Sequence, residues 1–117
     1  MKKYAKTHEW VEEEADQVLI GLTDYAQKEL GDIVFINLPE AGDELVCGES
    51  FADVESVKAV SEIYAPVSGI ISAVNEEVVD NPAKINEDAE NTWLIKARAV
   101  TEREELLEAA EYLALLS

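Results

Sequence analysis

The sequence predicts a mostly β fold with two helices, on the basis of three observations. Short apolar runs alternate with turn residues through most of the chain, which is typical of short strands. Helix signals occur in only two segments, at residues 23–30 and 101–116. The 117 residues are enough for one domain with a hydrophobic core and too few for two, so we expect a single domain over residues 1–117.

The strand segments are the apolar runs themselves. They lie at residues 18–20, 33–36, 45–47, 70–71 and 93–95. Glycine and proline, which favour turns, recur between the runs. The punctuating residues are Gly31, Pro39, Gly42, Gly48, Gly69 and Pro82. This spacing predicts a β core.

The first expected helix covers residues 23–30 and is an insertion between strands. Thr23 is a suitable N-cap because its hydroxyl can accept a hydrogen bond from a free backbone N–H of the first turn. Gly31 follows the last helical residue and is a suitable C-cap, since glycine tolerates the left-handed conformation found there.

A β-hairpin is expected between residues 50 and 67. Two β-compatible arms flank a short centre, so Lys58 should lie at the tip, in water. The returning arm is expected to end in a turn at residues 67–69, which include Gly69. Alternate residues of the arms should turn one apolar face inward: Ala52, Val54, Ile63, Ala65 and Val67.

The second expected helix covers about residues 101–116. Thr101 and Glu104 have the spacing of a capping box, in which each side chain bonds a backbone N–H near the other. Apolar residues then recur at helical spacing, at positions 106, 109, 110, 113 and 116. We expect this stripe to seal one side of the sheet.

The strong negative charge limits the possible partners. Nine basic residues against 26 acidic ones give a net charge of -17, which repels phosphate backbones and anionic lipid surfaces. No nucleic acid and no membrane partner is therefore expected. Basic patches on other proteins are the complementary surface, and such docking should weaken as salt rises. No signal peptide or membrane span is evident, so a cytoplasmic location is the default, although a mature mitochondrial form would have the same sequence.

Few residues are available for catalysis or metal binding. Cys47 is the one cysteine, so an intrachain disulfide or a cysteine metal cluster cannot form, and we expect it to be a small core residue. His8 is the one histidine. No catalytic residue and no metal site is therefore assigned, and an enzyme acting alone is the weakest interpretation.

Four ordered motifs resemble the glycine cleavage system H protein family. The segment around the expected hairpin reads Glu-Ser-Val-Lys-Ala at 55–59 and Ile-Tyr-Ala-Pro-Val-Ser-Gly at 63–69, similar to that family's lipoylation segment. The other three are Thr-His-Glu-Trp-Val at 7–11, Ile-Gly-Leu-Thr-Asp-Tyr-Ala-Gln at 20–27 and Leu-Gly-Asp-Ile-Val-Phe-Ile-Asn-Leu-Pro at 30–39. The resemblance covers about residues 3–116.

The resemblance implies a lipoyl-type barrel-sandwich hybrid of two small antiparallel sheets. It implies that lipoate is the cofactor, joined as a covalent lipoyl amide to Lys58, with Glu55 and Gly69 at the family spacing of the attachment motif. The protein would carry the aminomethyl group of glycine between glycine decarboxylase (P protein), aminomethyltransferase (T protein) and dihydrolipoyl dehydrogenase (L protein). A lipoate ligase or lipoyl transferase would attach the arm.

The resemblance also implies an arm-binding cleft. Thr7, Glu9 and Glu62 would contact the loaded arm, whose terminal amine is cationic at neutral pH. Two carboxylates would stabilise that cation, and we expect the pair to be half exposed. The alternative is that Glu9 and Glu62 are ordinary surface charges.

One segment, residues 86–93, departs from the family pattern. Ala89 stands where the family usually has Pro-Tyr, and Thr92 stands where it usually has the glycine just before Trp93. The loop over residues 86–93 is therefore expected to differ in shape.

The nearest alternative function is an H-like lipoyl carrier for lipoate relay or a regulatory modification system. A biotinyl carrier and an unmodified binding module are further alternatives.

Overall fold

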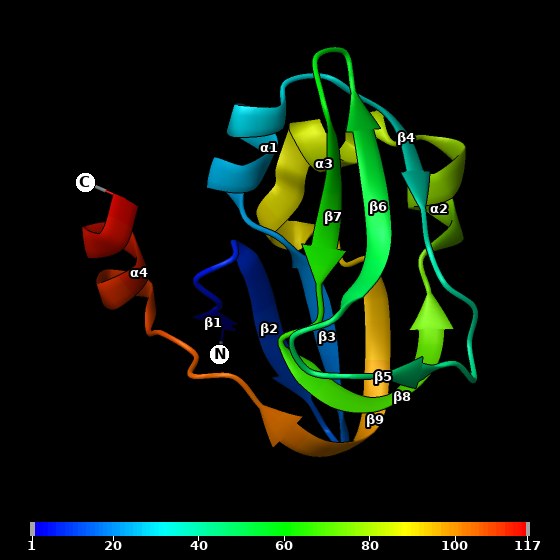
Figure 1. Ribbon diagram of the computed structural model, residues 1–117, viewed down its shortest axis with the longest axis vertical. Helices are drawn as coiled ribbons and strands as arrows, with labels where there is room; N and C mark the ends of the chain where they lie inside the picture. The colour runs from blue at the N-terminus through cyan, green and yellow to red at the C-terminus, as the bar shows by residue number, and fades with distance from the viewer. Residues whose placement is uncertain (1, 117) are drawn as a thin grey trace.

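The computed structural model describes residues 2–116 and contains two antiparallel sheets (Figure 1). The larger sheet has six strands in the order β1-β2-β3-β9-β8-β5, and the smaller has three in the order β4-β6-β7. The strands of the larger sheet are β1 Lys2–Tyr4, β2 Glu9–Glu14, β3 Gln17–Leu22, β5 Glu44–Leu45, β8 Val67–Val74 and β9 Ile95–Arg103. Those of the smaller sheet are β4 Ile33–Asn37, β6 Ser50–Ser56 and β7 Val60–Tyr64.

The core consists of two apolar clusters that lie side by side. One joins the smaller sheet to the helices and includes Ile36, Val54 and Ile63. The other lies on the larger sheet and includes Val18 and Ile95. A single half-buried side chain, Phe51 of β6, packs against both clusters. The two sheets therefore share one continuous interior, as the expected two-sheet fold requires.

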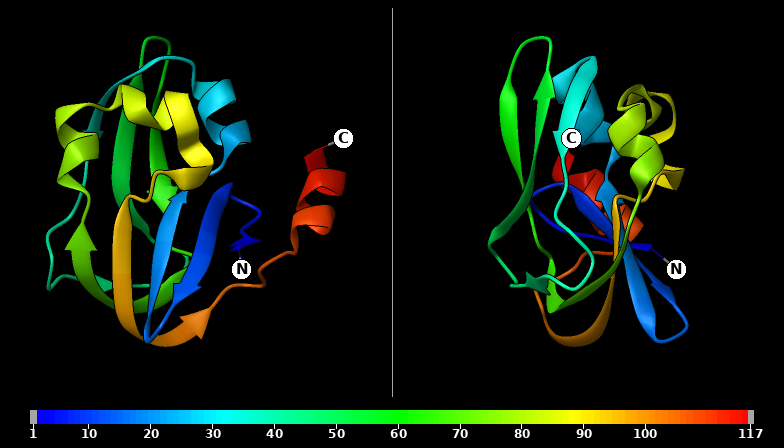
Figure 2. Two further views of the ribbon diagram at one scale, coloured as in Figure 1. Left: turned by 180° about the vertical axis from the view of Figure 1, so that it is seen from behind. Right: turned by 90° about the vertical axis from the view of Figure 1, so that its right-hand side faces the viewer.

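The helices between residues 24 and 88 lie at the end of the molecule that holds the β6–β7 hairpin, and the C-terminal helix lies apart from them at one side (Figure 2). The first helix confirms its expected caps, because the Thr23 hydroxyl accepts a hydrogen bond from the Ala26 N–H at 3.2 Å. Gly31 ends that helix with a φ of 79°, a conformation that favours glycine. The helices are α1 Asp24–Leu30, α2 Glu76–Asp80, α3 Ala83–Asp88 and α4 Ala109–Leu116, with a 3₁₀ turn at Ala89–Asn91.

The hairpin is confirmed, but the turn expected at residues 67–69 is wrong. The returning strand β7 ends at Tyr64, and β8 begins at Val67 in the other sheet. Gly69 lies inside β8, opposite Leu45, at a bulge in the pairing with β9. A Cβ atom at Gly69 would lie 2.6 Å from the Arg98 carbonyl oxygen, so glycine is required there by the close approach of the neighbouring strand.

The C-terminal helix is much shorter than expected. Thr101 and the two residues after it belong to β9, and only Ala109–Leu116 are helical. The capping-box prediction failed because residues 102 and 103 pair with β8, as Ser68 with Glu102 and Val67 with Arg103, and this long-range pairing outweighs a local helix signal. The expected apolar stripe is also wrong, since Leu113 is 64% exposed.

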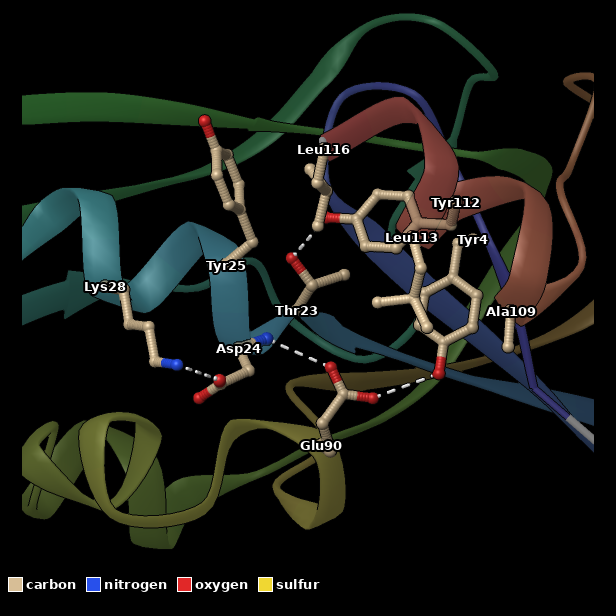
Figure 3. Close-up of a pocket in the computed structure, with 10 residues that line it drawn as sticks. All are labelled: Tyr4, Thr23, Asp24, Tyr25, Lys28, Glu90, Ala109, Tyr112, Leu113 and Leu116. Atoms are coloured by element: carbon tan, nitrogen blue, oxygen red, sulfur yellow. Dashed lines mark hydrogen bonds and ion pairs between the residues drawn. The ribbon is translucent and has the colours of Figure 1, made fainter.

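Helix α4 is attached to the body mainly through Tyr112, its one buried residue (Figure 3). The Tyr112 ring stacks on Tyr4 of β1 with ring centroids 4.9 Å apart. Its hydroxyl lies 2.8 Å from the Thr23 hydroxyl and 2.7 Å from Nδ1 of His8. Between α4 and α1, Tyr4, Thr23 and Tyr112 border a cavity of about 350 Å³.

The position of Cys47 differs from the expected one. Cys47 is half-buried rather than in the core, and its thiol donates to the Pro66 carbonyl at 3.6 Å.

Across residues 2–116, no helix has the length and apolar character needed to cross a membrane. Those same residues contain no group of three or more histidine, cysteine, aspartate or glutamate side chains placed to hold a metal ion.

Tyr112 should therefore contribute far more to stability than its neighbour Leu113. Tyr112→Ala removes the stack and both hydrogen bonds and should lower the free energy of unfolding by about 3 kcal/mol. Tyr112→Phe keeps the ring and should lower it by about 1–2 kcal/mol. Leu113→Ala is the matched control and should change it by no more than about 0.5 kcal/mol. Urea denaturation followed by circular dichroism measures all three, and equal values for the two alanine variants would contradict this account of α4.

Candidate functional site

The hairpin tip is a tight turn closed by Ser56. The Ser56 N–H donates to the Ala59 carbonyl at 2.8 Å. Its hydroxyl oxygen accepts from the N–H groups of Lys58 and Ala59, at 3.3 and 3.1 Å. Serine is suited to this position because its short side chain can replace a backbone acceptor in a turn. The turn therefore fixes the backbone of Lys58 while its side chain stays in solvent.

A second contact holds the tip against the end of α1. The Val57 N–H donates to the Asp32 carbonyl at 3.0 Å, which joins the hairpin to the α1–β4 connection. The Lys58 stem passes beside Gly31, where a Cβ atom would lie 3.5 Å from Lys58 Cε. The root of the Lys58 side chain thus has a defined direction, although the residue itself is exposed.

Lys58 also differs from the other lysines in its charge environment. Six lysines pair with carboxylates at 3.0 to 3.8 Å: Lys2, Lys3, Lys6, Lys28, Lys84 and Lys96. Within the described chain, residues 2–116, Lys58 has no such ion pair. Converting its amine to an amide would consequently break no salt bridge, whereas the same change at any other lysine would.

The two expected partners of Lys58 in the attachment motif lie in different places. Glu55 is exposed on β6, one residue before the turn begins, and pairs across the sheet with Val60 and Phe35. Gly69 lies in the larger sheet, outside the hairpin. The structure therefore keeps Glu55 beside the lysine and assigns Gly69 a packing role in β8.

The three expected cleft residues come together in one cavity. Thr7 and Glu9 reach it from the β1–β2 turn and the start of β2, and Glu62 reaches it from β7, the edge strand of the smaller sheet. The cavity has a volume of about 310 Å³. Its other walls are His8, Leu22, Tyr25, Ala26, Glu29, Leu30, Val54, Ser61 and Ile63.

Glu9 and Glu62 differ sharply in exposure, so the expectation of a half-exposed pair is wrong. Glu9 is only 2% exposed, whereas Glu62 is exposed. Burial raises the pKa of Glu9 to about 7, against the opposing effect of hydrogen bonds from the Thr7 hydroxyl and the Tyr64 backbone. The nearby Glu104 raises it slightly further. Near neutral pH the cleft therefore holds a carboxyl group that is about half protonated.

His8 lines this cleft, and Tyr25 lines both the cleft and the Tyr112 cavity. The His8 ring packs on Tyr25 with centroids 4.7 Å apart and contacts the Tyr112 hydroxyl through Nδ1. Burial lowers the pKa of His8, and the carboxylate of Glu29 on α1 opposes that effect. His8 and Tyr25 were not predicted as cleft residues, although they lie in the motifs at 7–11 and 20–27.

The segment that departs from the family pattern is firmly held. The Ala89 carbonyl accepts from the indole N–H of Trp10 at 3.0 Å, and the Thr92 hydroxyl donates to the Asp88 carbonyl at 2.7 Å. Asn86 joins this segment to the end of α1 and the start of β4, since its side chain bonds Gly31 and Ile33. The loop expected over residues 86–93 is wrong, because residues 86–88 belong to α3 and Ala89–Asn91 form a 3₁₀ turn. No sequence signal marked Asn86.

Comparisons with known proteins agree with this architecture. The family model for the glycine cleavage H-protein matches residues 2–117. A glycine cleavage system H protein of Lachnoclostridium phytofermentans is 57% identical over 110 residues, covering 93% of this chain and 87% of the relative. A probable glycine cleavage system H protein of Pyrococcus abyssi is 56% identical over 106 residues, covering 90% and 79%.

A solved structure extends the match to three dimensions. The crystal structure of a glycine cleavage system H protein from Mycobacterium marinum has a TM-score of 0.91 at 40% identity, covering 98% of this chain and 95% of that one. The two sheets and the hairpin therefore have the arrangement that the sequence resemblance implied. The chain belongs to the glycine cleavage H-protein family, whose members are lipoyl carriers of the glycine cleavage system rather than enzymes.

Proposed function

We propose that Lys58 carries lipoate as an amide and that the loaded protein shuttles the aminomethyl group of glycine. The observation that carries this proposal is the exposed Lys58 at the hairpin tip, the one lysine of residues 2–116 without a carboxylate partner. An amide at this position removes a charge that stabilises nothing else. The exposed position also lets an attaching enzyme reach the amine.

The mechanical properties of the hairpin suit a carrier. Short hydrogen bonds at Ser56 and Val57 hold the root of the arm, while the lysine stem and the attached chain supply reach. No general base is required on the carrier, because the decarboxylase, the aminomethyltransferase and the dihydrolipoyl dehydrogenase perform the chemical steps. The bound lipoyl group would supply the sulfur that holds the aminomethyl group.

Incubation with lipoate ligase, ATP and lipoate should label Lys58 and no other lysine. Labelling neutralises one positive charge, so the formal net charge should change from -17 to -18. Lys58→Arg should abolish labelling, and Lys28→Arg is a matched control that should not. Intact mass and peptide mapping are the measurements. Labelling that persists in Lys58→Arg, or that maps to Lys28, Lys84 or Lys96, would refute the site.

We further propose that the cavity lined by Thr7, Glu9 and Glu62 holds the loaded end of the arm. A lipoyl ring is uncharged, whereas the aminomethylated arm ends in an ammonium group. Carboxylates in the cavity therefore interact differently with the two states, and only such a difference can favour docking of the loaded arm. The two carboxylates contribute unequally because Glu9 is buried and Glu62 is exposed.

The raised pKa of Glu9 makes this docking depend on pH. Below about pH 7 the carboxyl group is mostly protonated and attracts an ammonium weakly. Above pH 7 it is ionised and buried, the condition in which a charged hydrogen bond contributes most. An incoming ammonium should also lower the pKa of Glu9, so docking near pH 7 should release part of a proton to solvent.

Glu9→Gln should speed the loss of the aminomethyl amine from the purified loaded carrier. We expect about a tenfold increase at pH 8, since a buried charge-assisted hydrogen bond contributes about 1.5–3 kcal/mol. The ratio of the Glu9→Gln decay rate to the parental decay rate should fall toward one at pH 5, where parental Glu9 is protonated. Glu62→Gln should give about a twofold increase at most. Parental decay rates for both variants at pH 8 would show that neither carboxylate holds the loaded arm.

Ionisation of Glu9 should also lower the free energy of unfolding of the unloaded protein as pH rises. Its pKa is about 7 in the folded chain and 4.5 ordinarily, so its favourable contribution is complete below about pH 4.5 and is lost as pH rises through 7. Relative to the parent, Glu9→Gln should gain about 2–3 kcal/mol in the free energy of unfolding between pH 5 and pH 8. Glu62→Gln is the exposed control and should differ little from the parent at either pH. Urea denaturation at both pH values measures the difference, and a parallel pH profile for Glu9→Gln and parent would contradict a buried, titrating Glu9.

A further inference from the structure

The outer face of the smaller sheet carries an apolar and acidic surface beside Lys58. Strand pairing places Phe35, Glu55 and Val60 in one row across β4, β6 and β7. The next row holds Asn37, Asp53 and Glu62. Cross-strand partners point to the same side of a sheet, about 5 Å apart. We call this surface the hairpin face and define it by Phe35, Asp53, Glu55, Val60 and Glu62.

The apolar members of the hairpin face are at least half exposed. Phe35 is 50% exposed and Val60 is 69% exposed. Their inward-facing neighbours Ile36 and Ile63 are each 1% exposed, so the sheet has one buried and one open side. No other helix or strand of residues 2–116 lies over the open side in Figure 1. Two apolar side chains thus flank a carboxylate in water, which favours a binding role.

The charges of the hairpin face have one sign. Across the three strands and the connecting turn, Lys58 is the one basic residue, and Asp53, Glu55 and Glu62 are acidic. Even before acylation, the three carboxylates outnumber that base. A partner that covers this face must therefore present an apolar contact surrounded by basic side chains, since acidic or neutral surroundings would leave the carboxylates without compensation.

The length of the lysine side chain determines which partner must contact this face. The enzyme that attaches the lipoyl group acts on the bare amine, at the end of a four-carbon stem. Its active site must approach the hairpin backbone to within the length of that stem. Val60 is only two residues from Lys58, roughly 7 Å along an extended chain. Later partners meet the far end of the extended arm and can remain further away. The attaching enzyme alone is forced onto the surface around the turn.

We propose that the hairpin face is the docking surface for the lipoate-attaching enzyme, with Phe35 and Val60 as its apolar contacts and Asp53 and Glu62 as its electrostatic ones. This inference rests on the proposed lipoylation of Lys58 and identifies the surface that the attaching enzyme recognises. The bound enzyme presents lysine or arginine side chains around an apolar depression. Glu55, between the two apolar residues, takes the central charged contact.

The test uses a purified lipoate ligase with lipoate and ATP, and measures initial labelling rates against carrier concentration. Phe35→Ser with Val60→Ser should raise the KM for the carrier about tenfold and leave kcat nearly unchanged, because the chemistry at the amine is the same. The matched control is Leu113→Ser with Leu115→Ser on α4, which removes two similarly exposed apolar side chains away from the hairpin. That control should keep the parental KM.

A second pair of variants tests the charges. Asp53→Asn with Glu62→Gln should raise KM at low salt and reduce its dependence on ionic strength. Glu76→Gln with Glu87→Gln removes two exposed carboxylates of α2 and α3 and should leave the salt dependence parental. Thermal melts identify any variant that fails to fold. Should Phe35→Ser do so, Val60→Ser alone, at a more exposed position, is expected to raise KM about threefold.

The outcomes separate this inference from the proposed function. A parental KM in both hairpin-face variants, with Lys58 still labelled, would overturn the docking surface and leave the carrier role intact. An unchanged ligase KM with slower reduction or oxidation by dihydrolipoyl dehydrogenase would also overturn it and assign the face to a later partner. Absence of labelling in the parental protein would overturn the proposed function and the docking surface together.

Discussion

The side-chain amide of Asn86 joins the three parts of the chain on which the site depends. Its nitrogen donates to Gln27 Oε1 at 3.0 Å and to the Gly31 carbonyl at 2.9 Å, and its oxygen accepts from the Ile33 N–H at 2.8 Å. These bonds satisfy backbone groups at the end of α1 and at the start of β4, and they connect both elements to α3. The Lys58 stem lies beside Gly31, and the hairpin tip is bonded to the next residue, Asp32. The direction of the arm therefore depends on an amide far from it in sequence.

The site combines two environments that a small domain rarely places so close together. At the hairpin tip, the polar groups are in water and a charge can be added or removed at little cost. In the cleft, Glu9 is held in an apolar setting that shifts its proton affinity toward neutrality. The fold achieves this because β7 is an edge strand, so one side of the hairpin borders the cleft while its outer side stays open. A buried ionisable group beside an exposed attachment point is the arrangement expected where a cofactor end must be held and released.

Local patterns were sufficient to predict much of this structure from the sequence. Thr23 and Gly31 marked the limits of α1, and the alternation from Ala52 to Ile63 marked the inward face of the hairpin. Residues 101–116 could not be predicted in the same way, because a capping-box pattern there competes with pairing to a strand more than thirty positions earlier. The exposure difference between Glu9 and Glu62 was equally inaccessible, since it depends on which elements pack over each residue. Asn86 carried no periodic or motif signal, although its three hydrogen bonds make it central.

Gly69 illustrates how a recurring residue can be attributed to the wrong selective pressure. It accompanies the attachment lysine in the family motif, yet it lies in the opposite sheet, where the backbone of β9 leaves no room for a side chain. A glycine at this position would be retained by a barrel of this shape whatever group its hairpin carried, or if it carried none. Substitutions there would distort the barrel, and a mutational screen scored only on the proposed modification of Lys58 would record them as losses of enzyme recognition. The separation in sequence between Lys58 and Gly69 is thus a property of the scaffold, in which Gly69 packs against β9.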